Sequence, residues 1–207
     1  GWPEILPSGK AVPLVAKRPK LPKSKAQPGW LQWRDDFNRK ALGAEWLTRR
    51  APQQAWLDLQ GAPGSLTLGG DGKTSFVGHS HAVVETELRK ANILAGERAG
   101  LAAIADENHH YFFGLQGENL VVAVRDGAKD PEIGRIIAQL RFNGPANNAL
   151  RLRMTAKGSK YDFAYSVAGD EWKTLLADAD GRVLATEHDG LLFTGTVIGL
   201  YASRPSS

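Results

Sequence analysis

The stretch FTGTVIGLYA, residues 193–202, is the part of this sequence that most clearly indicates a fold. It is rich in β-branched and aromatic residues, which favour extended backbone. Gly195 and Gly199 interrupt the run, and glycine in such a pattern marks a turn or a close approach of two backbones. The stretch therefore predicts a buried β-strand behind a glycine turn.

Short apolar runs recur from Trp33 onward, and turn-forming residues separate them. The candidate strands lie at 66–68, 83–88, 101–104, 111–115, 120–124, 136–142, 150–154 and 161–165. Many short strands with frequent turns and almost no helical periodicity predict an all-β fold, namely a two-sheet antiparallel β-sandwich or jelly roll. One short helix is expected near 130–133, and we find no internal repeat.

The tryptophans Trp46, Trp56 and Trp172 are expected to pack in the core between the two sheets, because tryptophan buries a large apolar area. Most other aromatic residues occupy alternating strand positions that also point inward. This pattern disfavours the row of exposed aromatic side chains that an independent sugar-binding surface needs.

The first thirty residues differ in composition from the rest. Six of the eleven prolines lie at positions 3, 7, 13, 19, 22 and 28. Proline excludes this segment from helices and central strands, so it should run extended, at about 3.1 Å per residue where it is polyproline-like. Apolar side chains such as Trp2, Leu6 and Trp30 favour a strap across a neighbouring surface over a free linker. We therefore expect a proline-rich, basic linker or strap over residues 1–33 and a β-sandwich domain over residues 34–207.

The net charge of +4 is concentrated in this strap. Residues 1–30 contain six Lys or Arg residues and one acid, Glu4, so they carry +5 and the remaining residues carry −1. The basic excess does not lie on a folded face with interleaved aromatic residues, which is the pattern of a nucleic-acid interface. We expect no nucleic-acid partner.

The sequence contains no cysteine, which excludes disulfides, thiolate zinc sites and cysteine nucleophiles.

No apolar run approaches the ~20 residues of a membrane span, so we expect no membrane partner. The start, GWPEILPSGK, lacks an initiator Met and does not resemble a signal peptide. We therefore expect either a processed product or a recombinant segment of a longer protein. The compartment stays open, with a periplasmic or secreted location slightly favoured over a cytoplasmic one.

Several motifs follow one another along the chain. They are GWP at 1–3, DDF at 35–37, LGAEW at 42–46, GSLTL at 64–68, GERAGL at 96–101, YDFAYS at 161–166, GDEW at 169–172 and FTGTVIGLYA at 193–202. In this order and at this spacing, the sequence resembles the C-terminal concanavalin A-like β-sandwich domain of glycoside hydrolase family 43, a family of β-xylosidases and α-L-arabinofuranosidases. The resemblance covers nearly the whole chain and implies a concanavalin A-like jelly roll.

The resemblance also implies a function. In this family the sandwich is a non-catalytic accessory domain of an enzyme that acts on xylo- or arabino-oligosaccharides. It packs on a catalytic five-bladed β-propeller, and one of its loops helps to shape the substrate pocket, so the oligosaccharide is an indirect ligand. By position, Phe76 and His79 are the residues expected at the edge of the pocket. The propeller would belong to the same polypeptide or to a separate chain.

Two departures from the family pattern stand out. The stretch Ser75–His81 lacks the Arg pair and Gln that usually precede the Thr-x-Leu strand. The family also continues beyond its G-L-Y-A segment with a further strand, whereas this sequence stops at Ser207. We therefore expect either a missing closing strand or a first strand left alone at the sheet edge.

The sequence offers no convincing catalytic acid pair. Glycoside hydrolysis needs two carboxyl groups about 5–9.5 Å apart. The candidate pairs are Glu85 with Glu87, Asp106 with Glu107, and Asp178 with Asp180. Glu85 and Glu87 share a strand face but lack a third acid and an aromatic surround, so a solvated face explains them better. We assign no catalytic residue, and whether the chain alone is an enzyme stays open. The alternatives are an independent carbohydrate-binding module and a complete small jelly-roll glycosidase.

The histidines and loop aspartates are the candidate metal ligands. His79 and His81 share a strand face and would need a third ligand to bind zinc, whereas His109 and His110 point to opposite faces. His188 lies between two acids. We assign no metal ligand and expect no required cofactor. A structural calcium ion stays open, and its candidate ligands are Asp35, Asp36, Asp178, Asp180 and Asp189.

Overall fold

The structure is a computed structural model. It describes residues 33–43, 46–48, 57–69, 75–79, 83–89, 93–142, 149–169, 171–185, 188 and 195–204, with the backbone alone for 75–79. The chain divides into two compact units, Gly1–Asp35 and Asp36–Ser207. The predicted strap over residues 1–33 lies outside the described residues except for Trp33, so its extended conformation stays a prediction.

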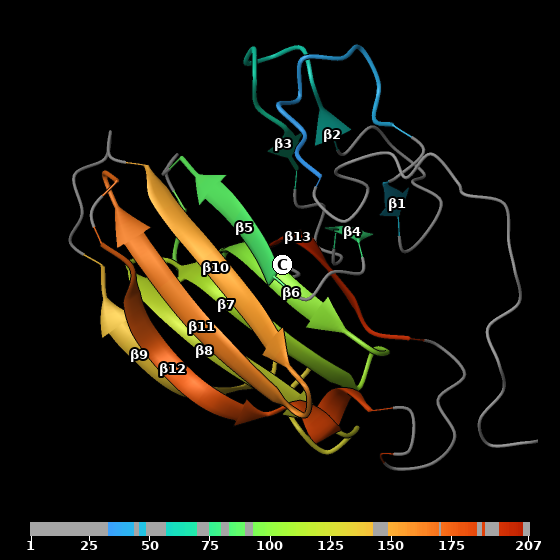
Figure 1. Ribbon diagram of the computed structural model, residues 1–207, viewed down its shortest axis with the longest axis vertical. Coiled ribbons are helices and arrows are strands. Elements are labelled where there is room, and N and C mark those ends of the chain that lie inside the picture. The colour runs from blue at the N-terminus through green and yellow to red at the C-terminus, as the bar shows by residue number, and fades with distance from the viewer. Residues whose placement is uncertain are drawn as a thin grey trace, which may run out of the picture. The chain divides into compact units, whose positions relative to one another are not determined.

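The described part of the second unit is built from short β-strands and one 3₁₀ helix (Figure 1). The elements are β1 (Leu47–Thr48), β2 (Leu57–Asp58), β3 (Thr67–Leu68), β4 (Ser75–His79), β5 (Val83–Leu88), β6 (Arg98–Ile104), β7 (His109–Gln116), β8 (Asn119–Asp126), β9 (Arg135–Arg141), β10 (Leu150–Lys157), β11 (Lys160–Val167), β12 (Lys173–Asp180), η1 (Gly181–Leu184) and β13 (Val197–Ser203). Among the described residues, no helix is long and apolar enough to cross a membrane.

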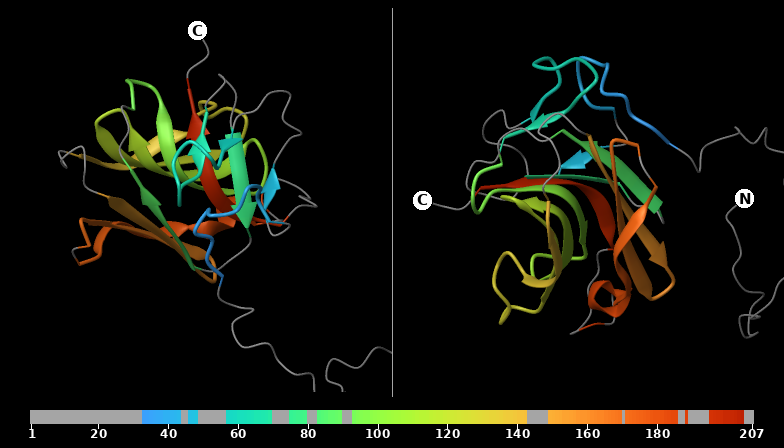
Figure 2. Two further views of the ribbon diagram at one scale, coloured as in Figure 1. Left: turned by 90° about the horizontal axis from the view of Figure 1, so that it is seen from above. Right: turned by 90° about the vertical axis from the view of Figure 1, so that its left-hand side faces the viewer.

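The strands form two facing antiparallel sheets and a small third one. The larger sheet has the order β1-β4-β13-β6-β7-β8-β9, the smaller has the order β12-β11-β10-β5, and β2 pairs with β3. Seen edge-on, β6 to β9 curve opposite β10 to β12 (Figure 2, right). The prediction of a two-sheet antiparallel sandwich is confirmed.

The main core lies between the two facing sheets. The larger sheet contributes Leu101, Tyr111, Phe113, Leu115, Leu120, Val122 and Ile198, and the smaller contributes Leu150, Leu152, Met154, Tyr161 and Phe163. Strand β10 shows the expected alternation most clearly, because Leu150, Leu152 and Met154 are fully buried while the arginines between them are not. Burial of alternate apolar residues therefore sets the register of the smaller sheet.

Residues 197–202 of the stretch FTGTVIGLYA lie in β13, a central strand of the larger sheet, whereas Phe193 and Thr194 lie outside the described residues. Strand β13 pairs with β4 on one side and β6 on the other. Its Ile198 faces the main core, whereas Tyr201 belongs to a second buried cluster with Phe112 and Val121. Both faces of the central strands are buried, which explains why their sequences are continuous apolar runs.

All the strand candidates of the sequence analysis coincide with observed strands, although the bounds differ by a few residues. The pattern did not single out β12 as a strand of its own, because its sequence KTLLADAD has only a weak alternation. The motif YDFAYS with GDEW does form the expected hairpin of β11 and β12. Its turn includes Ala168 and Gly169, both at positive φ.

The short helix expected near 130–133 is wrong. This segment is a turn, closed by a 2.8 Å hydrogen bond from the Gly134 amide to the Pro131 carbonyl. Gly134 has a φ of +76°, which no helical residue adopts, and β9 begins at the next residue. The helical element of the described chain is instead η1, after β12.

The core position expected for Trp172 is also wrong. Trp172 is half-buried on the outer side of the smaller sheet, where the Arg153 guanidinium lies 3.9 Å and that of Arg151 5.0 Å from its ring centroid. Both arginines alternate with the core residues of β10 and therefore point outward. Trp46 is half-buried and its ring lies 5.7 Å from that of Phe37, and Trp56 lies outside the described residues.

The GERAGL motif has a physical explanation in β6. Gly100 and Gly114 are direct cross-strand partners in β6 and β7. A Cβ atom on Gly100 would lie 2.6 Å from the Gly114 Cα, so neither position has room for a side chain. The Glu97 carboxylate accepts hydrogen bonds from the Leu94 amide at 2.9 Å and from Arg204 at 2.8 Å. The motif thus fixes the entry to β6 and ties it to the end of β13.

Candidate metal centre

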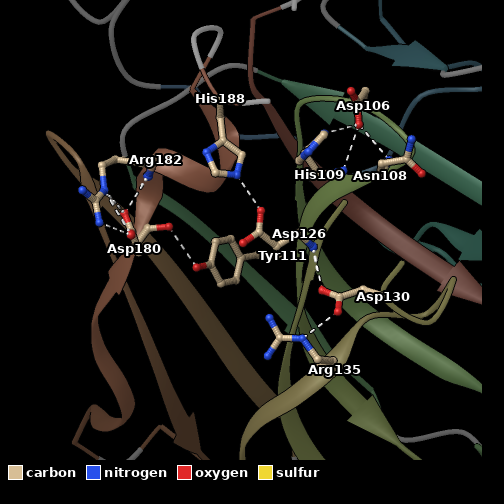
Figure 3. A network of polar contacts seen from close by, with 10 residues as sticks. All are labelled: Asp106, Asn108, His109, Tyr111, Asp126, Asp130, Arg135, Asp180, Arg182 and His188. Atoms are coloured by element: carbon tan, nitrogen blue, oxygen red, sulfur yellow. Dashed lines mark hydrogen bonds and ion pairs between the residues drawn. The ribbon is translucent and has the colours of Figure 1, made fainter. Parts of the chain in front are cut away.

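Three side chains distant in sequence meet at one end of the sandwich (Figure 3). His109 begins β7 and Asp126 ends β8, and the two are direct cross-strand partners. The His188 Nε2 atom lies 2.6 Å from Asp126 Oδ1, and the rings of His109 and His188 meet edge to face at 5.5 Å. One potential ligand atom from each residue lies within 4.8 Å of the other two.

The turn before β7 fixes the His109 imidazole. Asp106 Oδ1 accepts hydrogen bonds from the amides of Asn108 at 2.7 Å and His109 at 2.8 Å, and it lies 2.9 Å from His109 Nδ1. Burial raises the pKa of Asp106, but the hydrogen bonds from Asn108 and His109 outweigh it, so the pKa is lowered overall. An ionised carboxylate only accepts hydrogen bonds, so Nδ1 of His109 is the donor. In the neutral imidazole, Nε2 is then the nitrogen with a lone pair, which can accept a hydrogen bond or bind a metal ion.

The 3₁₀ helix η1 (Gly181–Leu184) and the turn after it position His188. The Asp180 side chain caps η1 by accepting a hydrogen bond from the Arg182 amide at 3.0 Å, and the last two residues of η1 are buried in the core. The His188 amide then donates to the Ala185 carbonyl at 3.0 Å. This second turn brings the imidazole over the end of β8.

Polar contacts also anchor η1 to the larger sheet. The Tyr111 hydroxyl donates to the Asp180 carbonyl at 3.0 Å, and the carboxylate of Asp180 pairs with Arg182 at 2.6 Å. Burial raises the pKa of Tyr111 to about 12, and the hydrogen bond from Arg182 lowers the pKa of Asp180 to about 2. The end of β12 is therefore held against β7 close to His188.

The β8–β9 connection braces Asp126 from the other side. Asp130 accepts a hydrogen bond from the Asp126 amide at 2.9 Å and one from Arg135 Nε at 2.8 Å. The first of these is the main reason that the pKa of Asp130 is lowered. The Gly127 amide donates to the Asn108 carbonyl at 2.9 Å, which joins the two loops that carry Asp126 and His109.

The sequence pattern marks the histidines as candidate ligands one by one but does not link these three residues. His109, Asp126 and His188 lie 17 and 62 positions apart, and no fixed spacing joins them. One part of the site could have been found from the sequence. If β7 and β8 are paired as a hairpin with residues 117 and 118 in the turn, His109 and Asp126 become direct cross-strand partners. The position of His188 depends on η1, which the sequence pattern did not reveal.

The other predicted site residues lie elsewhere. Phe76 and His79 belong to β4, where they are backbone partners of Tyr201 and Ile198 in β13. Their side chains and His81 lie outside the described residues, so their place at a substrate pocket stays a prediction. His110 follows His109 in β7 and therefore projects from the opposite strand face.

The candidate carboxylates Glu85 and Glu87 lie close to arginines. Glu85 lies 2.7 Å from Arg153 Nε and 3.1 Å from Arg151 Nη2, on the outer side of the smaller sheet. Glu87 is exposed and lies 3.8 Å from Arg89. These contacts agree with a solvated strand face.

The candidate calcium ligands do not gather in the described part of the chain. Asp178 lies 2.9 Å from Lys160, and Asp180 is occupied by Arg182. Asp35 and Asp36 precede β1, and Asp189 lies outside the described residues. Structural calcium stays an untested expectation.

The order of strands, the two-layer core and the hairpin of β11 and β12 define a concanavalin A-like sandwich. Residues 34–207 match the family described as the β-xylosidase C-terminal concanavalin A-like domain, and the chain belongs to this family.

Two comparisons illustrate the relationship. The chain is 31% identical over 218 aligned residues to the non-reducing end α-L-arabinofuranosidase BoGH43B of Bacteroides ovatus, a match that covers 98% of this chain and 39% of that protein. The solved xylan β-1,4-xylosidase of Bacillus halodurans C-125 shares the fold, with a TM-score of 0.73 and 21% identity over 82% of this chain and 35% of the other.

A third relative gives the same picture. The GH43 protein BlXynB of Bacillus licheniformis has a TM-score of 0.72 and 23% identity, over 96% of this chain and 40% of that protein. The chain thus spans about two fifths of the length of the relatives that it matches, and the remainder of each lies outside the match.

Proposed function

We propose that this chain is the non-catalytic accessory sandwich of a family 43 glycoside hydrolase that acts on xylo- or arabino-oligosaccharides. It packs on a catalytic five-bladed β-propeller and helps to shape the substrate pocket. The observation that carries the proposal is the extent of the match. The chain is covered almost completely by an arabinofuranosidase relative, yet it accounts for only 39% of that protein.

The charged groups of the described sandwich agree with an accessory role. The acids Glu85 and Asp180 are engaged by arginines, and Asp106 by backbone amides and an imidazole. None of these arrangements places two carboxyl groups across an open pocket, which is what glycoside hydrolysis requires. We propose that the catalytic acids belong to the propeller.

The test is an assay of the 207-residue chain on aryl xylosides and arabinosides, with and without a separately produced family 43 propeller chain. We expect no turnover by the chain alone and restored or increased turnover when the propeller is added. Turnover by the chain alone would overturn the proposal. Strong retention on a xylan affinity gel without turnover would instead favour an independent carbohydrate-binding module.

The pocket-edge role of β4 needs its own variants in the reconstituted enzyme. Phe76→Ala and His79→Ala should alter KM for the aryl glycoside more than kcat, because such residues exclude water and limit the pocket rather than transfer protons. Val83→Ala is a matched control, since this side chain is exposed on β5 of the opposite sheet. Equal kinetic constants for all three variants and the unaltered chain would refute the role.

A further inference from the structure

We propose that His109, Asp126 and His188 form a binding site for one divalent transition-metal ion of the zinc type. Nε2 of each imidazole and one carboxylate oxygen of Asp126 would be the protein ligands, and a water molecule would take the fourth position. The inference does not rest on the proposed function, because it concerns a separate set of residues at the end of the sandwich.

The distances suit a small ion. The three potential ligand atoms lie within 4.8 Å of one another, and the 2.6 Å hydrogen-bond distance between His188 Nε2 and Asp126 Oδ1 would widen when an ion binds between them. Ligands bound to zinc at about 2.0–2.2 Å in a tetrahedron lie roughly 3.3–3.6 Å apart. Side-chain rotations alone can bring these atoms into that range, since His188 and Asp126 are each about one third exposed.

The residue behind His109 is the kind of partner that metal-bound histidines have. Asp106 accepts a hydrogen bond from the Nδ1–H group of His109 at 2.9 Å and also accepts hydrogen bonds from two backbone amides. A carboxylate on the far nitrogen fixes the tautomer and the ring orientation and makes the near nitrogen a better ligand. In Figure 3, His109 lies between Asp106 on one side and Asp126 on the other.

The donor set selects the class of metal. Two imidazole nitrogens and one carboxylate oxygen suit zinc and other divalent transition ions, whereas calcium prefers six to eight oxygen ligands. His109 is 5% exposed while the other two side chains reach solvent, so the site has a closed back and an open entry.

A bound ion would link three segments that are otherwise connected to one another by hydrogen bonds. The ligands come from the start of β7, the end of β8 and the connection between η1 and β13. An ion at this point would fix the position of His188 over the larger sheet. We therefore assign it a structural role, as a clamp on the β12–β13 connection.

The test uses the untagged 207-residue chain, stripped of metal by a chelating resin and titrated with zinc chloride by calorimetry. We expect one ion per chain. At a free zinc concentration 100 times Kd, the melting temperature should rise by about 5–10 °C, and excess chelator should reverse the rise. Cobalt chloride should give the visible absorption of a low-symmetry, nitrogen- and oxygen-bound ion.

The variants separate this site from adventitious binding. His188→Ala and Asp126→Asn should each weaken zinc binding at least tenfold, and Asp106→Asn should weaken it about 10–100-fold by loosening His109. His110→Ala is the matched control, because it removes the neighbouring imidazole from the opposite face of β7 and should leave Kd unchanged.

Two results would overturn the proposal. One is the absence of saturable zinc binding to the folded chain, which would leave His188 and Asp126 as a hydrogen-bonded pair only. The other is an equal zinc Kd in His188→Ala and in the unaltered chain. Circular dichroism of each variant before titration shows that it is folded.

Discussion

Replacement of Tyr111 by phenylalanine should make the protein less stable at neutral pH and more stable at high pH. Tyr111 is 2% exposed, and its hydroxyl donates a 3.0 Å hydrogen bond to the Asp180 carbonyl. Loss of one such bond costs about 1 kcal/mol of unfolding free energy. At pH 7 the Tyr111→Phe variant should therefore be less stable by about this amount.

The reversal comes from ionisation of the phenol. Burial, with a smaller contribution from the carboxylates of Asp180 and Asp126, raises the pKa of Tyr111 from 10.0 to about 12. The unfolded chain then loses this proton at lower pH than the folded protein does, so stability is complete below pH 10 and is lost as the pH rises toward 12. Two pKa units correspond to about 3 kcal/mol. The phenylalanine variant loses none of this, so the two stability curves should cross close to pH 11.

The measurement is urea unfolding followed by circular dichroism at half-unit steps from pH 7 to about 11.5. The difference between the two proteins cancels the titration of all groups that they share. Tyr161→Phe is a useful second variant, because burial also raises the pKa of Tyr161 and its difference curve should bend in the same direction. A difference between Tyr111→Phe and the unaltered protein that stays constant from pH 8 to 11.5 would refute the reasoning.

Three further changes have defined outcomes. Gly114→Ala should cost about 1–3 kcal/mol in urea unfolding, because the new Cβ would lie 2.7 Å from the Gly100 Cα, while Gly195→Ala, which meets nothing within 4 Å, should change stability by less than about 0.5 kcal/mol. The pKa of the Asp180 carboxyl is lowered to about 2, so the unaltered protein should lose stability as this group is protonated between about pH 4 and pH 2. Asp180→Asn cannot be protonated and should therefore lose less stability over this range. Acid-unfolding curves of the two proteins that superimpose would contradict this. Trp172→Ala should cost only about 1–2 kcal/mol, as expected for a cation–π contact on an outer sheet face, and a cost of 3–5 kcal/mol would indicate the core position that the structure does not show.

Much of the fold could be predicted because the pattern of apolar residues is local information. Alternation in β10 and the continuous runs of β7 and β8 mark strands that are buried on one face or on both. The failures occurred where a short segment had no such periodicity. The turn before β9 contains acids and a proline in helix-like order, but the positive φ of Gly134 and the pairing of β9 determine its conformation.

Trp172 shows a second limit. Composition alone suggested that a large aromatic ring would enter the core, yet the residue follows the β11–β12 turn. The register of β11 with β12 and β10 places it beside the outward arginines of β10. Propensity for burial does not say which face of a sheet a residue joins, and a shift of one position reverses the answer.

The sequence by itself determined the all-β class, the position of most strands and the family, because each of these depends on the order of residues along the chain. Only the tertiary structure brought His109, Asp126 and His188 together. Two of them meet through the hairpin register of β7 and β8, and the third through the 3₁₀ turn after β12. A site of this kind depends on distances between segments far apart in the chain, which packing of the two sheets sets and local residue patterns do not record.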